Sequence, residues 1–485
     1  MPPTLRSTLV PGAVAALILL PACTPGSDDV GTDDADVVAA EASGECAAGD
    51  WFPHATTPEP NSGEFDPQSQ CSFHQWSWQA FLWLTQDDGT GQPRFLSFTR
   101  PQELFGSSAS SALVPRMAKS QTPEPIGTFL QAGTDGIMTD QAGRPIYYSL
   151  YVDPVFERFV TENELTDPAA LLAFDPTTNF PDSAMTLKAS WKIVEDGEDV
   201  SGFFTTETEV YPLANRAGTI VVDTTRSDRV TLAMVGFHVA GKVRGHPEMI
   251  WATFEHVDNA PSVFVPDSAG SPPGLTDPVS NRDWTFYAAG TPRSECNVNT
   301  ASSPVRRLDE AAQTISPITQ VCREYRYGNL PTADPTSPIE QAAAVNDSNV
   351  ASLNAHVLAG LASDDVWRNY EEVGAIWFTG ADALQPGLAL DGICVTGSLQ
   401  DGACVDASGQ PTARLIGSLR LSNSTIETFT QSQSTMFNCF RCHNTDQRLY
   451  TASAPAPGQA PTALPAKNVN ISHILVNGFF RNQDE

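Results

Sequence analysis

The sequence predicts a mainly β fold with peripheral helices, of the α+β class with a sandwich-like core, and a short helical segment at its C-terminal end. Three observations lead to this prediction. Stretches rich in branched and aromatic residues recur through the middle of the chain, and helical patterns are few. The 38 prolines and 34 glycines interrupt these stretches every few positions. A Cys-x-x-Cys-His motif lies at residues 439–443.

Residues 1–22 have the features of a bacterial lipoprotein signal peptide. Arg6 precedes an apolar run at residues 12–20, which is too short to span a bilayer as a mature helix. Leu-Pro-Ala-Cys at residues 20–23 resembles the lipobox, whose cysteine becomes the lipidated N-terminus. An ordinary cleavage site with an incidental cysteine is the alternative. We therefore expect an exported protein that reaches the membrane only through lipid on Cys23.

Residues 23–48 form an acidic stretch with almost no large apolar side chains, which predicts a flexible tether. Thr24 after the lipidated cysteine, instead of an aspartate, resembles the sorting pattern of outer-membrane lipoproteins. We expect attachment there, facing the periplasm or the cell surface. The formal charge of −30 argues against a nucleic-acid partner and suits attraction of a basic protein.

Nine cysteines are present, and an oxidising compartment makes their number informative. Setting aside Cys23 and the two motif cysteines leaves six, which allow fifteen pairings. Closeness in the sequence favours three short loops: Cys46–Cys71, Cys296–Cys322 and Cys394–Cys404. One or two free thiols, or other pairings, are the alternative.

Residues 49–422 are predicted to form a β-rich domain. The expected strands lie within residues 186–194, 218–225, 229–241, 248–258 and 282–290. Two helices are expected, at residues 72–86 and 338–362. The second is rich in alanine, and we expect it to break near Asn346 and Asp347.

The motif Cys439-Phe440-Arg441-Cys442-His443 is the attachment signature of one covalent haem c. Cysteines three residues apart lie on one side of a helical turn, so both can bond to one porphyrin, and His443 can then bind the iron. A thioredoxin-like site would need a surrounding βαβ pattern, and a zinc site a second pair of ligands. A structural disulfide within the motif would be strained.

The second iron ligand is less constrained by the sequence. No methionine follows Met436, which lies only three residues before Cys439 and is awkwardly placed to reach the opposite haem face. His473 lies thirty residues after His443, behind a Pro/Ala-rich loop, and would give two histidine ligands and a low potential. The other candidates are upstream: His74, His238, His246, His256 and Met185. An open position is the remaining alternative.

Residues 423–485 form the cytochrome c-like segment. A helix is expected over residues 423–440, with Asn423 or Ser424 as its cap and Glu427 at capping-box spacing. After the motif and a Pro-rich loop, the chain contains one short apolar segment, residues 471–480. This is too little surface to enclose a haem, so we expect the segment to pack on the upstream domain.

One dense polar stretch, residues 236–261, could line the haem pocket. His238, Glu255 or His256 would supply an iron ligand, a proton donor or a propionate contact. Lys242 and Arg244 also suit propionates. A structural hydrogen-bonded network at a turn is the alternative.

Several segments together resemble a known group of proteins. They are "WSWQAFLWL", "TLKASWKIV", "VGFHVAGKVRGHPEMIWATFEHVDNAP", "NYEEVGAIWF" and "LSNSTIETFTQ…NCFRCHN". In this order, over about residues 70 to 480, they resemble large exported bacterial proteins of the cytochrome c family. The resemblance implies one haem at the C-terminal end, held by Cys439, Cys442 and His443, and electron transfer as the default function. It implies no substrate.

These observations predict a lipid-anchored monohaem cytochrome that exchanges electrons with a redox partner protein. The alternative is a haem-dependent oxidoreductase of peroxidase or oxygenase type, with a small-molecule substrate pocket in the upstream domain. The size of that domain favours the enzyme, whereas the single haem and the resemblance favour electron transfer.

Overall fold

The computed structural model describes residues 46–52, 54–61, 67, 69–106, 114–115, 137–264, 272–299, 306–330, 334–379, 384–388, 390, 392–400, 402–420, 422–431, 438–449 and 463–481. The predicted signal peptide, Cys23 and most of the tether lie outside these residues. The α-helices are α2 (Gln70–Thr85), α3 (Pro101–Leu104), α5 (Pro154–Glu162), α6 (Pro168–Ala173), α7 (Pro338–Gly360) and α8 (His473–Arg481).

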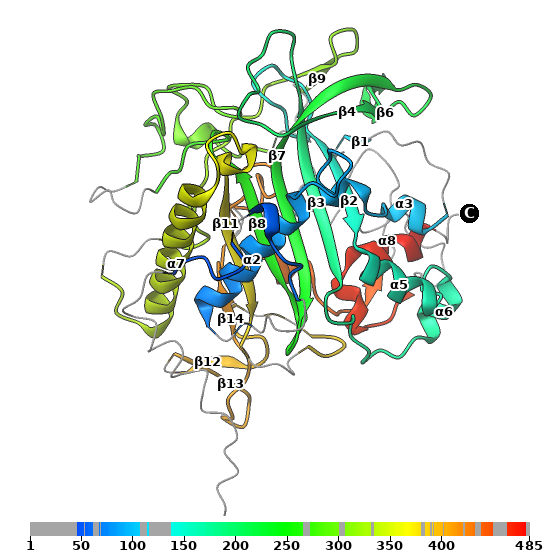
Figure 1. Ribbon diagram of the computed structural model, residues 1–485, viewed down its shortest axis with the longest axis vertical. Helices are drawn as coiled ribbons and strands as arrows, with labels where there is room; N and C mark the ends of the chain where they lie inside the picture. The colour runs from blue at the N-terminus through cyan, green and yellow to red at the C-terminus, as the bar shows by residue number, and fades with distance from the viewer. Residues whose placement is uncertain are drawn as a thin grey trace, which may run out of the picture.

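One large antiparallel sheet organises the molecule (Figure 1). Its order is β1 (Val114–Pro115), β2 (Tyr147–Val152), β3 (Met185–Ile193), β7 (Asp228–Val243), β8 (His246–His256), β11 (Tyr370–Phe378) and β14 (Leu415–Gly417), with β4 (Thr205–Val210) also paired to β7. Four two-stranded sheets pair β5 (Leu213–Arg216) with β6 (Thr219–Val222), β9 (Arg307–Asp309) with β10 (Thr314–Ser316), β12 (Ser398–Gln400) with β13 (Ala403–Val405), and β15 (Arg448–Leu449) with β16 (Ala463–Leu464).

Helices α2 and α7 cover one face of this sheet, which we call the aromatic face. Phe81 of α2 stacks on Phe254 of β8, with ring centroids 4.3 Å apart, and Phe73 stacks on Trp377 of β11 at 4.1 Å. Both helices begin with a capping box, in which Ser69 caps α2 and Ser337 caps α7. Burial of these large rings makes this face the main hydrophobic core.

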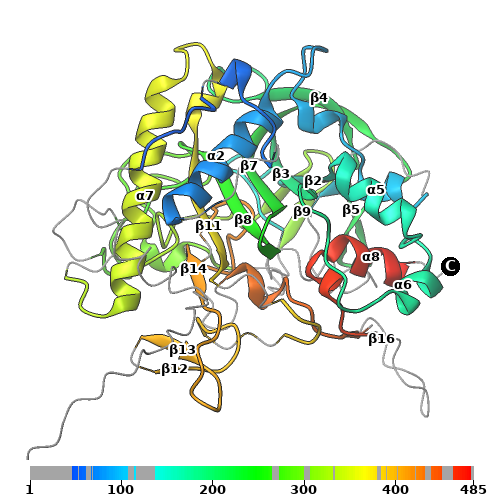
Figure 2. The same cartoon turned by 60° about the horizontal axis from the view of Figure 1, so that its bottom comes forward.

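The opposite face carries Lys188, Ser190, His238, Thr253 and Glu255, and we call it the polar face. Successive side chains of a strand point to opposite faces, and the neighbours of these residues belong to the aromatic core. The last segments of the chain lie on this side of the sheet, as Figure 2 shows for β16 and α8. The sheet therefore separates α2 and α7 from the cysteine motif.

Much of the predicted secondary structure is confirmed, including the mainly β class, both long helices and four of the five strand segments. Three details are wrong. The described residues contain one large sheet instead of two stacked sheets, so the core is not a sandwich. Helix α7 runs unbroken past Asn346. The side chain of Asn346 bonds to His74 and Ser418 outside the helix, so it does not compete with the hydrogen bonds of the helix backbone. Residues 282–290 form turns with one isolated bridge.

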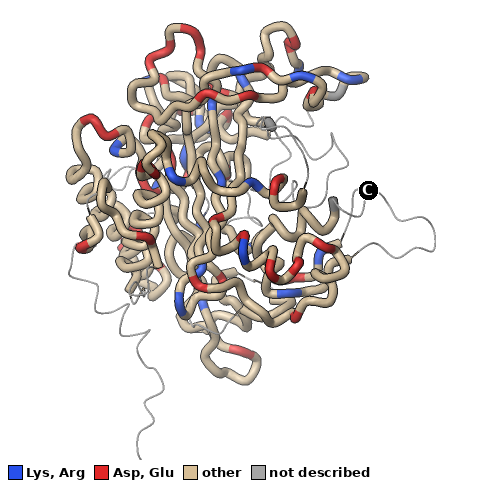
Figure 3. The backbone as a smooth tube through the Cα atoms, turned by 45° about the vertical axis from the view of Figure 1, so that its right-hand side comes forward, with Lys and Arg blue, Asp and Glu red and all other residues tan. Residues whose placement is uncertain are grey.

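The three predicted disulfides are confirmed. Cys46–Cys71, Cys296–Cys322 and Cys394–Cys404 join chain segments 25, 26 and 10 residues apart, with Cα atoms 5.4 to 5.5 Å from each other. The positions of aspartate and glutamate residues are distributed along many parts of the backbone, with fewer lysine and arginine positions among them (Figure 3). Within the described ranges, none of the helices combines the length and the apolar character needed to cross a bilayer.

Candidate haem-binding site

The cysteine motif folds into a single tight helical turn. Residues Cys439–Arg441 form a 3-10 turn, and the amide N–H groups of Cys442 and His443 donate to the Cys439 carbonyl at 3.1 and 2.8 Å. Asn438 caps this turn, because its side-chain oxygen accepts from the Arg441 amide at 3.2 Å. The turn brings both cysteines and His443 together, as attachment of a single group to both thiols requires.

Neither motif cysteine forms a disulfide, whereas the other six cysteines of the described chain are paired. Cys442 is buried, and Cys439 is half-buried against apolar neighbours. Burial raises the pKa of the Cys442 thiol to about 11 and that of Cys439 well above its ordinary value, with Glu427 adding to the second shift. The folded chain therefore keeps both thiols protonated and unreactive at neutral pH.

The orientation of His443 is set from the far end of the chain. Its Nδ1 lies 3.0 Å from the carbonyl oxygen of Ile471, so Nδ1 carries the proton and donates it. This tautomer leaves the lone pair on Nε2, as metal ligation through Nε2 requires. Burial lowers the pKa of His443 to about 3, which keeps the ring neutral.

His443 lies between two other rings. Trp251 of β8 contacts one side, with ring centroids 4.0 Å apart, and His473 stacks on it at 3.9 Å with an interplanar angle of 18°. The Nε2 of His473 donates to the Cys442 carbonyl at 2.9 Å. Burial, reinforced by the neighbouring His443, lowers the pKa of His473 well below its ordinary value. His473 thus supports the motif through its stacking on the ring of His443 and its hydrogen bond to the Cys442 carbonyl.

Most side chains packed around the motif are apolar, although the buried guanidinium of Arg448 donates to the Cys442 carbonyl at 2.8 Å. Phe440 is fully buried between Phe378 of β11 and Trp251, with ring centroids 4.5 and 6.2 Å away. Buried side chains of α8, including Leu475 and Phe479, complete the same cluster. Such a shell excludes water from a bound group.

The residues present fit a covalently attached haem. The thiols are unbridged, His443 presents the correct nitrogen, and the shell is hydrophobic. No group of three or more His, Cys, Asp and Glu side chains in the described part of the chain is arranged to hold a metal ion directly. The signature predicted from the sequence thus has a geometry suited to attachment through the porphyrin.

The structure separates the three upstream residues that were predicted to line a haem pocket. His238 of β7 and Glu255 of β8 lie on the polar face, together with Trp251. His256 lies on the aromatic side, where it stacks on Phe203 at 3.7 Å and bonds to the Gly202 carbonyl at 3.0 Å. Burial lowers the pKa of His256 to about 4, so this ring is neutral.

Glu255 belongs to a buried ion cluster. Its carboxylate lies 2.6 Å from the guanidinium of Arg323, which also bonds to Glu371 at 2.6 Å. Glu255 and Glu371 are direct cross-strand partners, so Arg323 offsets the repulsion between them. Glu255 also accepts hydrogen bonds from the amide and hydroxyl of Ser424. These contacts give Glu255 a structural role in anchoring residues 422–431.

Residues 422–431 are buried against the polar face although most of them are polar. The side-chain amide of Asn423 donates to Thr253 and to the Phe254 carbonyl, and Thr425 bonds to Ser190 at 2.7 Å. The predicted helix over residues 423–440 is wrong for the described residues of this range, which form turns. The sheet satisfies the polar groups of this segment, so a regular helix is not needed.

Glu427 is the residue of this segment that sequence reasoning undervalued. One carboxylate oxygen accepts from the amides of Ser422 and Asn423 at 2.9 and 2.8 Å, and the other lies 3.5 Å from the Nε2 of His238. Burial raises the pKa of Glu427 to about 7. Its sequence position indicated a helix cap but not its approach to His238.

The other predicted ligands lie elsewhere. His74 bonds to Glu372 and Asn346, and His246 to Glu248. Met185 belongs to the aromatic core. Lys242 pairs with Asp182 near the end of β7, and Arg244 is exposed. The structure therefore brings none of these five residues to the motif.

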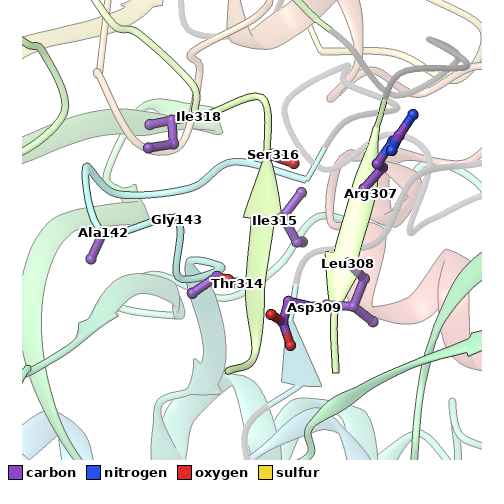
Figure 4. Close-up of a pocket in the computed structure, with 9 residues that line it drawn as sticks. All are labelled: Ala142, Gly143, Arg307, Leu308, Asp309, Thr314, Ile315, Ser316 and Ile318. Atoms are coloured by element: carbon purple, nitrogen blue, oxygen red, sulfur yellow. The ribbon is translucent and has the colours of Figure 1, made fainter. Parts of the chain in front are cut away.

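A small pocket of about 280 Å³ opens between the turn at Ala142 and Gly143 and the β9–β10 hairpin. Figure 4 shows Arg307, Asp309 and Ser316 at its rim. None of the predicted site residues lines it.

Comparisons with models of known protein families, with curated proteins and with solved structures each found no match to this chain.

Proposed function

We propose that the chain is an exported, lipid-anchored monohaem c-type cytochrome that transfers electrons to or from a protein partner. The observation that carries the proposal is the state of the motif: two unbridged cysteines and a histidine whose Nδ1 is held by the Ile471 carbonyl. The three disulfides suit an oxidising compartment. The predicted lipidation of Cys23 lies outside the described residues and enters the proposal from the sequence alone.

In this proposal, haem c bound to Cys439 and Cys442 supplies one-electron chemistry. His443 would offer Nε2 to the iron, because the Ile471 carbonyl keeps the ring in the tautomer that ligation through Nε2 requires. Trp251 and His473 hold the ring from its two sides. Phe440 and the α8 side chains keep water away, and a low-dielectric shell of this kind tunes a redox potential.

Covalent haem is tested directly by producing the protein with c-type maturation machinery and staining a denaturing gel for haem. We expect a haem-stained band for the natural sequence and none for Cys439→Ser/Cys442→Ser. The matched control is Cys46→Ser/Cys71→Ser, which removes two cysteines from the aromatic core on the other side of the sheet and should keep the stain. An exported natural protein without haem, or with a Cys439–Cys442 disulfide, would refute the proposal.

A haem-dependent oxidoreductase is the second candidate, and one observation favours it. The polar face places a histidine and a carboxylic acid, His238 and Glu427, within 3.5 Å of each other on the side of the sheet that carries the motif. Such a pair could serve proton transfer to a substrate. Carbon monoxide separates the candidates, because it binds only an accessible iron. An unchanged reduced spectrum favours electron transfer, and ready binding favours the enzyme.

A further inference from the structure

The polar face near the motif holds one histidine that could complete the iron coordination. The sequence has eight histidines, all within the described residues. Five are engaged away from the motif: His54 with Asp365, His74 with Glu372, His246 with Glu248, His256 with Gly202, and His356 with Ala48. Besides His443 and His473, only His238 shares the motif's side of the sheet.

The strand register fixes the place of His238. It lies opposite Lys188 of β3 and Thr253 of β8, while Ala240, two residues further along β7, lies opposite Trp251. Two residues span roughly 7 Å along a strand, and neighbouring strands lie about 5 Å apart. The backbones of His238 and Trp251 are therefore separated by about the length of one side chain. The ring of Trp251 in turn contacts His443.

Glu427 links His238 to the motif a second time. Its carboxylate lies 3.5 Å from the Nε2 of His238, and its charge also acts on the thiol of Cys439. The carboxylate is held by two backbone amides, so its position is fixed. A carboxylate on one ring nitrogen is the usual way in which a ligating histidine is oriented.

We propose that His238 is the second axial ligand of the haem iron and that Glu427 is the residue that positions it. This inference rests on the proposed function, because it requires haem at Cys439 and Cys442. It gives the large β domain a direct role in the redox centre, since the iron would then be held between β7 and the C-terminal motif.

The rival ligands are less suited. His473 faces the flat side of His443, whereas two ligands of one iron meet it end-on from opposite sides. Its Nε2 is also committed to the Cys442 carbonyl. Met249 is buried in the same apolar cluster as Phe440, at an unusual φ of 67° for a methionine. Met249 is therefore included in the test as a rival ligand.

The test is the absorption spectrum of haem-loaded variants, oxidised, reduced, and reduced with carbon monoxide. We expect the natural protein to be low-spin and His238→Ala to become high-spin and to bind carbon monoxide. His473→Ala, Met249→Leu and the exposed control His356→Ala should remain low-spin. Added imidazole should restore the low-spin spectrum of His238→Ala, because it can occupy the coordination position that the missing side chain leaves.

Two further variants keep the inference falsifiable. His238→Met retains a ligand, so it should stay six-coordinate with a higher reduction potential. Glu427→Gln should keep the low-spin spectrum but weaken the ligand, so that carbon monoxide binds at least tenfold faster than in the natural protein.

A low-spin His238→Ala would overturn the inference, as would a high-spin His473→Ala or Met249→Leu beside an unchanged His238→Ala. A natural protein that is already high-spin would overturn it too. Failure of the proposed function would give a different result, because neither the natural protein nor any variant would then carry haem.

Discussion

The imidazole rings of His443 and His473 lie face to face, with centroids 3.9 Å apart and planes inclined by 18°. The sequence made His473 one of several candidates for the second ligand of an iron bound by His443. Their stacking gives His473 a different role, because it braces His443 and bonds to the carbonyl of Cys442, the residue before His443 in the chain. The prediction that His473 ligates the iron stays untested, but this arrangement favours a supporting role.

We therefore expect His473→Ala to destabilise the fold without loss of covalent haem. Removal of a buried hydrogen bond and a ring contact should lower the free energy of unfolding by about 1–3 kcal/mol. Urea denaturation followed by tryptophan fluorescence measures this change. Loss of haem staining in a variant that still folds would contradict the assignment.

Gly236→Ala should disrupt the docking of residues 422–431. A Cβ at Gly236 would lie 2.6 Å from the hydroxyl oxygen of Ser190 and still nearer to that of Thr425, closer than real contacts allow. We expect a loss of about 1–3 kcal/mol in unfolding free energy. Gly202→Ala is the matched control, because its new Cβ would meet only ordinary contacts at 3.5 Å and beyond. Equal effects of the two changes would disprove this account.

Arg323→Ala should be among the most damaging single changes. It would leave Glu255 and Glu371, cross-strand partners in a buried site, without their cation. Breaking a buried ion pair in this way costs about 3–5 kcal/mol. Arg229→Ala breaks an ion pair with Glu207 whose side chains are 76% and 63% exposed, and should change the unfolding free energy far less, because solvent screens this pair. Thermal unfolding of both variants tests the contrast.

Asp153 predicts a pH dependence of stability. It caps α5 and accepts the amides of Phe156 and Met185 at 2.9 and 2.8 Å, but burial dominates and raises its pKa from 3.8 to about 6. The folded chain thus binds this proton more tightly than the unfolded chain. This contribution to stability is complete below about pH 3.8 and is lost as pH rises through 6.

Asp153→Asn removes the titration and retains a side-chain oxygen for the cap. Between pH 4.5 and pH 7.5, the natural protein should lose about 2 kcal/mol more of its unfolding free energy than this variant does. Denaturant titrations at the two pH values give the comparison. A parallel change in both proteins would show that Asp153 does not titrate in this range.

Local sequence signals were sufficient to predict the helices for which the apolar pattern and the capping residues indicate the same boundaries. Helix α2 carries a dense aromatic pattern, and α7 begins at Ser337-Pro338 with Glu340 in the capping position. The disulfides were predictable because each joins near neighbours in the sequence. The motif itself is defined by five consecutive residues.

Long-range contacts account for what was missed. Residues 423–431 contain helix signals, yet Glu255, Thr253 and Ser190 from two separate strands satisfy their polar groups. The pairing of Glu427 with His238 joins residues 189 positions apart, and no local pattern reports it. One local signal for the polar face of the sheet was Lys188, because it is a charged residue between apolar neighbours in a predicted strand. The number of sheets depends on strand pairing, which the periodicity of single strands does not encode.

The bonds of the motif to the last described residues impose an order on the making of the molecule. Ile471 and His473 hold His443 and Cys442, and the thiols are enclosed once these bonds form. For the proposed cytochrome, an enzyme that joins haem to both sulfur atoms would therefore have to act while residues 463–481 are still undocked. Haem attachment would then compete with the docking of this segment, and a chain that docks it first would remain without haem.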